Sequence, residues 1–88
     1  MRDRLPSVVQ ILYFAALAEL TGISEEPLEL PPELRTVGDF VAHLQRLRPA
    51  LRGKMASVRV ALDEEFALES DLLGQARTIA LIPPVAGG

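Results

Sequence analysis

The chain has 88 residues, enough for one small domain, and its charged side chains sum to a net charge of −3. It contains no cysteine, which excludes disulfides, thiolate metal sites and cysteine nucleophiles. The basic residues are scattered, which disfavours nucleic acid as a partner, and no apolar run approaches the roughly 20 residues of a membrane-spanning helix.

The N-terminal part of the chain predicts a tail, a strand and a short helix. Residues 1–7 are polar around a proline and are interpreted as a flexible tail. Residues 8–15, VVQILYFA, are almost continuously apolar and rich in β-branched and aromatic types. This composition predicts a strand that is buried on both faces at the centre of a sheet. Residues 16–20 favour a short helix, and Gly22 is a natural stop just after it.

The same segment also has features of a secretory signal. Two arginines precede the apolar run, and Ala16-Leu17-Ala18 is similar to a signal-peptidase site. Against this alternative, polar residues and a proline interrupt the pattern, and cleavage would remove an entire apolar strand. We therefore expect a cytoplasmic protein.

The middle of the chain predicts a second strand followed by the main helix. Residues 27–31 alternate apolar and polar side chains between two prolines, which is typical of an edge strand. Thr36 and Asp39 have the spacing of a capping box, which marks a helix start. Pro49 limits how far this helix extends. Between them, one apolar stripe follows the helical period and comprises Val37, Phe40, Val41, Leu44 and Leu47.

The last part of the chain predicts three more strands. Residues 58–62 and 65–68 are two short strands around an acidic bend, and residues 78–82, TIALI, are a second strongly apolar strand. The acidic groups Glu25-Glu26 and Asp63-Glu64-Glu65 are interpreted as solvated turns.

The order of these elements predicts the fold. It is strand, strand, helix and then three strands, and the first and last strands are the most apolar. Two such strands are best explained as neighbours at the sheet centre, with the helix packed across one face. We therefore expect an α+β fold of the ubiquitin-like β-grasp type over residues 8–82, with a mixed sheet of about five strands.

The chain closes with a slim tail, residues 83–88, that follows the last apolar strand directly. Two prolines favour an extended path, one valine is an apolar anchor, and the side chains then shrink to none. Such a segment suits insertion into a narrow tunnel. The tail residues expected to insert into a partner are Pro83, Pro84, Val85, Ala86 and Gly87.

The reactive group expected at the tip is the α-carboxylate of Gly88. A carboxylate is inert until it is activated, for example as a mixed anhydride with AMP. A sulfur donor can then displace AMP and leave a C-terminal thiocarboxylate, whose sulfur is a nucleophile near neutral pH, as a thiolate is. The alternative is an ordinary disordered end, because terminal glycines are common.

Two motifs carry a resemblance to a known family. Residues 11–15 (ILYFA) with 19–22 (ELTG), and the closing residues 79–88 (IALIPPVAGG), resemble the small, sulfur-carrying subunits of molybdopterin synthase, also called molybdopterin converting factor subunit 1. The resemblance spans about residues 9–88. It departs at Ala76-Arg77-Thr78, where the family has Gly-Asp-Glu, so family contacts at that turn are not carried over.

The resemblance implies a function for the C-terminus. Gly88 would be adenylated by a ubiquitin-activating-type adenylyltransferase that consumes ATP, and then converted to a thiocarboxylate. The tail would enter the large subunit of a heterotetrameric synthase and donate sulfur to cyclic pyranopterin monophosphate. Two rounds would form the dithiolene of molybdopterin. The catalytic side chains would belong to the large subunit, so this chain would bind no cofactor or metal and would not be an enzyme on its own.

The resemblance also implies an apolar docking patch for the large subunit. Phe14, Phe66 and Ile82 match its positions here, with burial in the core as the alternative. Two other functions remain open. The chain could be a β-grasp sulfur carrier or protein modifier for thiamin or tRNA thiolation, or a non-covalent β-grasp interaction module with an incidental tail.

Overall fold

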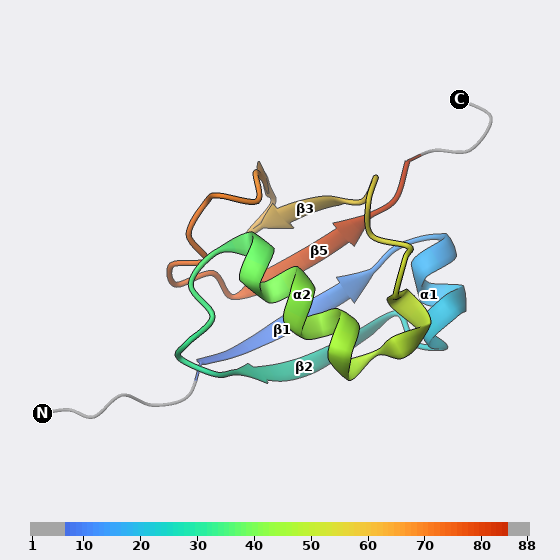
Figure 1. The fold of residues 1–88 in the computed structure, drawn as a ribbon, viewed down its shortest axis with the longest axis horizontal. Helices are drawn as coiled ribbons and strands as arrows, with labels where there is room; N and C mark the ends of the chain where they lie inside the picture. Colours follow the sequence, from blue (N-terminus) through green and yellow to red (C-terminus); the bar gives the residue numbers. More distant parts are fainter. Residues whose placement is uncertain (1–6, 85–88) are drawn as a thin grey trace, which may run out of the picture.

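The computed structural model describes residues 7–84, and within them five strands form one mixed sheet that a helix crosses on one side (Figure 1). The strands are β1 (Ser7–Tyr13), β2 (Glu25–Leu30), β3 (Arg59–Leu62), β4 (Glu65–Ala67) and β5 (Thr78–Ile82). The helices are α1 (Ala16–Thr21), α2 (Val37–Leu47) and the short 3-10 helix η1 (Pro49–Leu51). This arrangement confirms the predicted α+β β-grasp fold.

The two most apolar segments lie side by side at the centre of the sheet, as predicted. The strand order is β2-β1-β5-β3-β4, with β1 parallel to β5 and the other neighbours antiparallel. Since β1 and β5 run in the same direction, their C-terminal ends lie at the same end of the sheet. Strand β1 begins at Ser7, which had been assigned to the N-terminal tail, and residues 1–6 of that tail lie outside the described part.

The prediction that residues 8–15 are buried on both faces is wrong. Burial alternates along β1: Val9, Ile11 and Tyr13 are buried, whereas Val8 is 63% exposed and Leu12 is partly buried. Alternate side chains of a strand point to opposite faces, and α2 covers only one face of this sheet. The apolar residues on the other face are therefore not explained by burial in the core.

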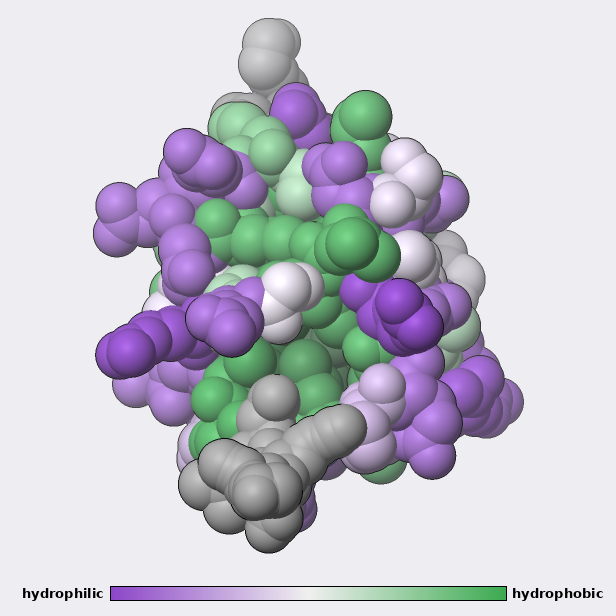
Figure 2. All heavy atoms as spheres, turned by 90° about the vertical axis from the view of Figure 1, so that its left-hand side faces the viewer, coloured by the Kyte–Doolittle hydropathy of each residue, from purple (hydrophilic) through white to green (hydrophobic). Residues whose placement is uncertain are grey.

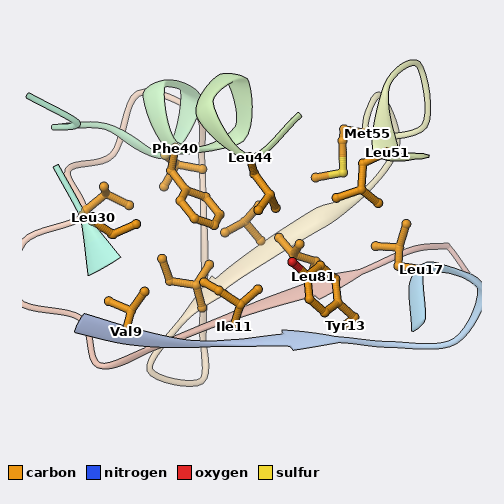
Figure 3. Close-up of a cluster of buried hydrophobic side chains, with 14 residues drawn as sticks. Val9, Ile11, Tyr13, Leu17, Leu30, Phe40, Leu44, Leu51, Met55 and Leu81 are labelled. Atoms are coloured by element: carbon orange, nitrogen blue, oxygen red, sulfur yellow. The ribbon is translucent and has the colours of Figure 1, made fainter. Parts of the chain in front are cut away.

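The core lies between α2 and the covered face of the sheet (Figure 3). Phe40 and Leu44 point from α2 toward Ile11 and Leu81, and all four side chains are fully buried. The apolar stripe is confirmed except at its end, because Leu47 is 42% exposed. Fully buried Leu51 of η1, together with Met55, fills the core beyond α2 instead, as Figure 3 shows.

The ends of the helices follow the predicted signals. The Thr36 hydroxyl accepts a hydrogen bond from the Asp39 amide at 3.1 Å, and the Asp39 carboxylate accepts one from the Thr36 amide at 3.1 Å, which completes the capping box. Backbone hydrogen bonds from Arg35 and then Thr36 hold the pKa of Asp39 below its ordinary value. Gly22 ends α1 in the left-handed conformation, with φ of 82°.

The interpretation of Glu26 as part of a solvated turn is wrong. Glu26 lies in β2, where its side chain connects three elements. Its carboxylate forms an ion pair with Arg48 at the end of α2 and accepts a hydrogen bond from the Tyr13 hydroxyl of β1 at 2.5 Å. Burial alone would raise the pKa of Glu26, but the hydrogen bonds from Arg48 and Tyr13 outweigh it and keep the pKa below its ordinary value. Burial, and then Glu26, raise the pKa of Tyr13.

The acidic bend between β3 and β4 is a tight two-residue turn. Asp63 and Glu64 both have positive φ, 49° and 75°, as the primed turns of hairpins require. The Asp63 carboxylate accepts hydrogen bonds from the Arg77 and Thr78 amides, each at 2.9 Å. Asp63 thereby fixes the start of β5 at the stretch where the sequence departs from the family pattern, a role that the solvated-turn interpretation missed.

Candidate functional site

The root of the C-terminal tail is held in the middle of the sheet. Ile82, the last residue of β5, lies opposite Arg59 of β3, and the Phe14 amide donates to the Leu81 carbonyl at 3.2 Å on the β1 side. Strands on both sides therefore fix where the chain leaves the domain. Pro83 is partly buried and Pro84 is exposed. The remaining expected tail residues, Val85, Ala86, Gly87 and Gly88, lie outside the described part of the structure.

A largely apolar surface continues from this root over the face of the sheet that α2 leaves open. Strand alternation puts Ala80 and Ile82 of β5 on this face, because Ile79 and Leu81 point into the core. The register then adds their direct neighbours: Leu12 and Ala61 beside Ala80, and Phe66 beside Ala61. Phe14 continues the alternation past Tyr13, so it falls on the same side. We call this surface the open face; its apolar members nearest the tail are Leu12, Phe14, Ala61, Phe66, Ala80 and Ile82.

The three residues expected to dock all lie on the open face. Phe66 is 60% exposed, Phe14 is 46% exposed and Ile82 is partly buried, and none of them belongs to the buried core cluster. The alternative that Phe14 and Phe66 are core residues is therefore wrong. Their contact with a partner remains a prediction. Large exposed aromatic residues gathered on one face are typical of protein interaction surfaces.

One charged residue of this face was missed by the sequence reasoning. The guanidinium of Arg59 lies over the Phe66 ring, 4.2 Å from its centroid. The signal was present in the sequence: a two-residue turn at residues 63–64 puts Ala61 opposite Phe66, which makes Arg59 a diagonal neighbour of Phe66. Beside the root of the tail the open face is thus apolar with one cation, Arg59, whereas farther out on the same face Glu25 of β2 lies opposite Leu12.

A second surface feature lies at the far end of the sheet. A hollow of about 340 Å³ with a mixed polar and apolar lining opens there, and Figure 2 shows hydrophobic residues gathered between hydrophilic ones at this end of the molecule. Its lining comes from the starts of β1 and β5, the end of β2 and the segment before β5. Since β1 and β5 are parallel, this hollow is at the opposite end of the sheet from Pro83 and is not part of the candidate site.

The carboxylates with lowered pKa values in the described residues take part in the fold. Within residues 7–84 no three His, Cys, Asp or Glu side chains come together to hold a metal ion, and no helix is long and apolar enough to cross a bilayer. Two of the carboxylates with shifted pKa values, Asp39 and Asp63, accept backbone hydrogen bonds of the fold. The third, Glu26, is paired with Arg48.

Comparison with known proteins identifies the family. The sequence pattern of the ThiS family matches residues 11–88, which includes both motifs of the resemblance and the whole tail. The chain belongs to the ThiS family. This assignment confirms the resemblance to β-grasp sulfur carriers. The molybdopterin synthase sulfur carrier subunit of Mycobacterium tuberculosis is 37% identical over 83 residues, which cover 91% of this chain and 96% of the relative. Further curated relatives carry the same name.

Two solved structures show the same ThiS-like architecture. SAMP1 of Haloferax volcanii, a small archaeal modifier protein, superposes with a TM-score of 0.78 at 27% identity, over 92% of this chain and 99% of that one. A chain in the complex of subunits 1 and 2 of the molybdopterin-converting factor from Helicobacter pylori superposes with a TM-score of 0.64 at 20% identity, over 92% of this chain and 99% of that one. The second likeness concerns the fold alone.

Proposed function

We propose that this chain is the small, sulfur-carrying subunit of molybdopterin synthase. The observation that carries the proposal is the match to the ThiS family through Gly88, on a fold whose central strand leads directly into Pro83 and Pro84. The curated relatives that carry the molybdopterin synthase name support the finer assignment. The cytoplasm, where soluble biosynthetic enzymes act, is the proposed location.

The proposed chemistry takes place at the Gly88 carboxylate. An oxygen of this carboxylate attacks the α-phosphate of ATP on a ubiquitin-activating-type adenylyltransferase and sulfurtransferase, which forms the acyl adenylate and releases pyrophosphate. A sulfur donor at the sulfide level replaces AMP and leaves the thiocarboxylate. In the large subunit this sulfur displaces an oxygen substituent from a carbon of cyclic pyranopterin monophosphate, which leaves the carrier joined to the pterin as a thioester. Water then cleaves the bond between the Gly88 acyl carbon and the sulfur, so the sulfur stays on the pterin and Gly88 returns to the carboxylate. Each dithiolene therefore takes the sulfur of two thiocarboxylates.

The described domain would serve as the platform that presents this group. Phe14, Phe66 and Ile82 of the open face would contact the large subunit, and residues 83–88 would enter its active site. The catalytic side chains belong to the large subunit in this proposal, so the chain supplies a reagent and a docking surface. The Helicobacter pylori complex of subunits 1 and 2 supports a partner of this kind, since one of its chains has the same fold.

A second function in the same family is protein modification. The observation that favours protein modification is the structural likeness to SAMP1 of Haloferax volcanii, at 27% identity. Both functions need an activated Gly88, but they differ in the acceptor: a lysine amine displaces AMP in protein modification, whereas sulfur does so in the carrier cycle. A carrier for thiamin or tRNA thiolation would share the thiocarboxylate and differ only in what receives the sulfur.

Reconstitution tests the proposal. The chain is incubated with the activating enzyme, ATP, a sulfur donor, the large subunit and cyclic pyranopterin monophosphate, and molybdopterin is measured. We expect product with the wild-type chain, and none after deletion of Gly87 and Gly88 or after addition of one phenylalanine beyond Gly88. A phenylalanine added before Met1 is the matched control and should leave the yield unchanged. Normal yield from the C-terminally extended chain, verified intact by mass, would contradict the proposal.

A further inference from the structure

We propose that Arg59 selects the partner of the open face by forming an ion pair with a carboxylate on the protein that covers Phe66. This inference rests on the proposed function, because it takes the open face as the docking surface. It adds the chemistry of the partner's side of the contact, which is an apolar surface with an Asp or Glu placed opposite the Phe66 ring.

The position of Arg59 makes its charge part of any contact with this face. Arg59 pairs with Ile82 across β3 and β5, so it lies beside the last strand residue before the tail. Its guanidinium carbon is 4.2 Å from the centroid of the Phe66 ring, and that ring is 60% exposed. A partner that covers Phe66 while it receives the tail must therefore cover Arg59 as well.

The donors of this guanidinium are not used within the described part of the chain. Among residues 7–84, the only ion pair joins Arg48 to Glu26, and no hydrogen bond from the Arg59 side chain to these residues is found. Glu64 and Glu65 lie on the same hairpin and are exposed, yet neither pairs with Arg59. The guanidinium carbon lies over the ring, and its N–H groups have no acceptor among residues 7–84, so they remain available for an acceptor on a partner.

Covering a charge that has no partner among residues 7–84 determines which partners are accepted. Contact with an apolar surface would remove water from the guanidinium without replacing its hydrogen bonds, which disfavours association. A carboxylate can accept two parallel hydrogen bonds from a guanidinium and offsets that loss. A partner with a basic residue at this point would be repelled. Arg59 thus discriminates among apolar surfaces that Phe14, Phe66 and Ile82 alone would accept equally well.

Titration calorimetry with the large subunit of molybdopterin synthase from the same organism tests the proposal. Arg59→Met keeps a long side chain over the ring without the charge, and Arg59→Glu reverses the charge. We expect affinity to fall about tenfold or more for Arg59→Met and further for Arg59→Glu, in the range measured for truncated interfacial charge pairs. Affinity of Arg59→Met should also depend less steeply on salt concentration than that of the wild type.

Arg46→Glu is the matched control, since Arg46 is an exposed arginine on α2, in the layer on the other side of the sheet. This substitution changes the net charge by the same amount as Arg59→Glu, and it should change the affinity by no more than about threefold. Replacing the contacting Asp or Glu of the large subunit by Lys should restore binding of Arg59→Glu.

Phe66→Asp, measured in the same series, separates failure of this inference from failure of the docking surface. If Phe66→Asp loses binding while both Arg59 variants bind as the wild type does, the role of Arg59 is wrong and the open face stands. Tighter binding by Arg59→Glu would also overturn it, because the partner would then be basic at this point. If Phe66→Asp binds normally, the open face is not the docking surface, and the proposed function loses its interface.

Discussion

The two faces of the sheet are built from the same five strands but have opposite surroundings. On the covered face, Ile11, Ile79 and Leu81 are fully buried beneath α2. On the open face, Phe66 is 60% and Phe14 is 46% exposed. Adjacent residues of one strand thus differ in surroundings: one contributes apolar burial to stability, and its neighbour leaves apolar area exposed, which we propose is for a partner. The open face should therefore tolerate changes that the covered face does not.

The largest expected effect on stability is on the covered face. Phe40→Ala removes a fully buried ring and leaves a cavity, so it should lower the free energy of unfolding by about 3–5 kcal/mol. Denaturant unfolding of the variant and the wild type measures this loss. Leu47→Ala, on the same helix but 42% exposed, is the control and should cost about 1 kcal/mol or less. Equal losses for the two variants would contradict the assignment of the core.

A smaller effect is expected at the ion pair that closes one end of the covered face. Glu26→Gln leaves the Arg48 guanidinium without its charged partner and should cost about 1–2 kcal/mol at neutral pH. The pKa of Glu26 is lowered in the folded state, so its contribution is present above the unfolded pKa of about 4.3 and is lost as pH falls through the lower folded value. When the pH is lowered from about 7 to about 3, the free energy of unfolding should decrease less for Glu26→Gln than for the wild type. Parallel curves would show that Glu26 does not contribute.

The capping box of α2 should contribute about 1 kcal/mol. Thr36→Ala removes the hydroxyl that accepts from the Asp39 amide, whereas Thr36→Ser keeps it. Thermal unfolding should therefore show a lower Tm for Thr36→Ala and a nearly unchanged Tm for Thr36→Ser. A similar decrease for both variants would point to the lost methyl group instead of the cap.

The smallest effect on stability is expected on the open face. Phe14→Asp should change the free energy of unfolding by about 0.5 kcal/mol or less, and yet abolish complex formation with the large subunit. Leu47→Asp is a matched control, because Leu47 is exposed to nearly the same extent, 42% against 46%, but lies on α2. In size-exclusion chromatography with the large subunit, Leu47→Asp should elute as a complex, whereas Phe14→Asp should not. Unfolding of Phe14→Asp would show that this residue belongs to the core.

Much of the fold could be predicted because its signals are local. The capping box, the glycine after α1 and the apolar periodicity of α2 lie within a few residues of the elements they define. The burial of β1 was misjudged because exposed apolar residues look the same in a sequence as apolar residues of a core. The partner of Glu26 could not be found, since Arg48 is 22 residues away and only the folded sheet brings them together.

The candidate site was predicted unevenly for a related reason. The tail and its Gly88 carboxylate were predicted from the last ten residues, through which the family match extends, and their role stays a prediction. Phe14, Phe66 and Ile82 came from the resemblance, because no local pattern distinguishes an exposed strand residue from a buried one. Arg59 was missed because its significance depends on the register of β3 and β4, which the two-residue turn sets.

Intact mass of the chain after incubation with its activating enzyme, ATP and a sulfur donor tests directly whether Gly88 carries the sulfur. The mass should rise by about 16 Da, the difference between sulfur and oxygen, and the increase should map to the C-terminal peptide and vanish on addition of the large subunit with cyclic pyranopterin monophosphate. A chain that is adenylated under these conditions but never gains this mass at Gly88 would contradict the carrier role. Conjugates to lysine side chains in its place would identify the chain as a protein modifier.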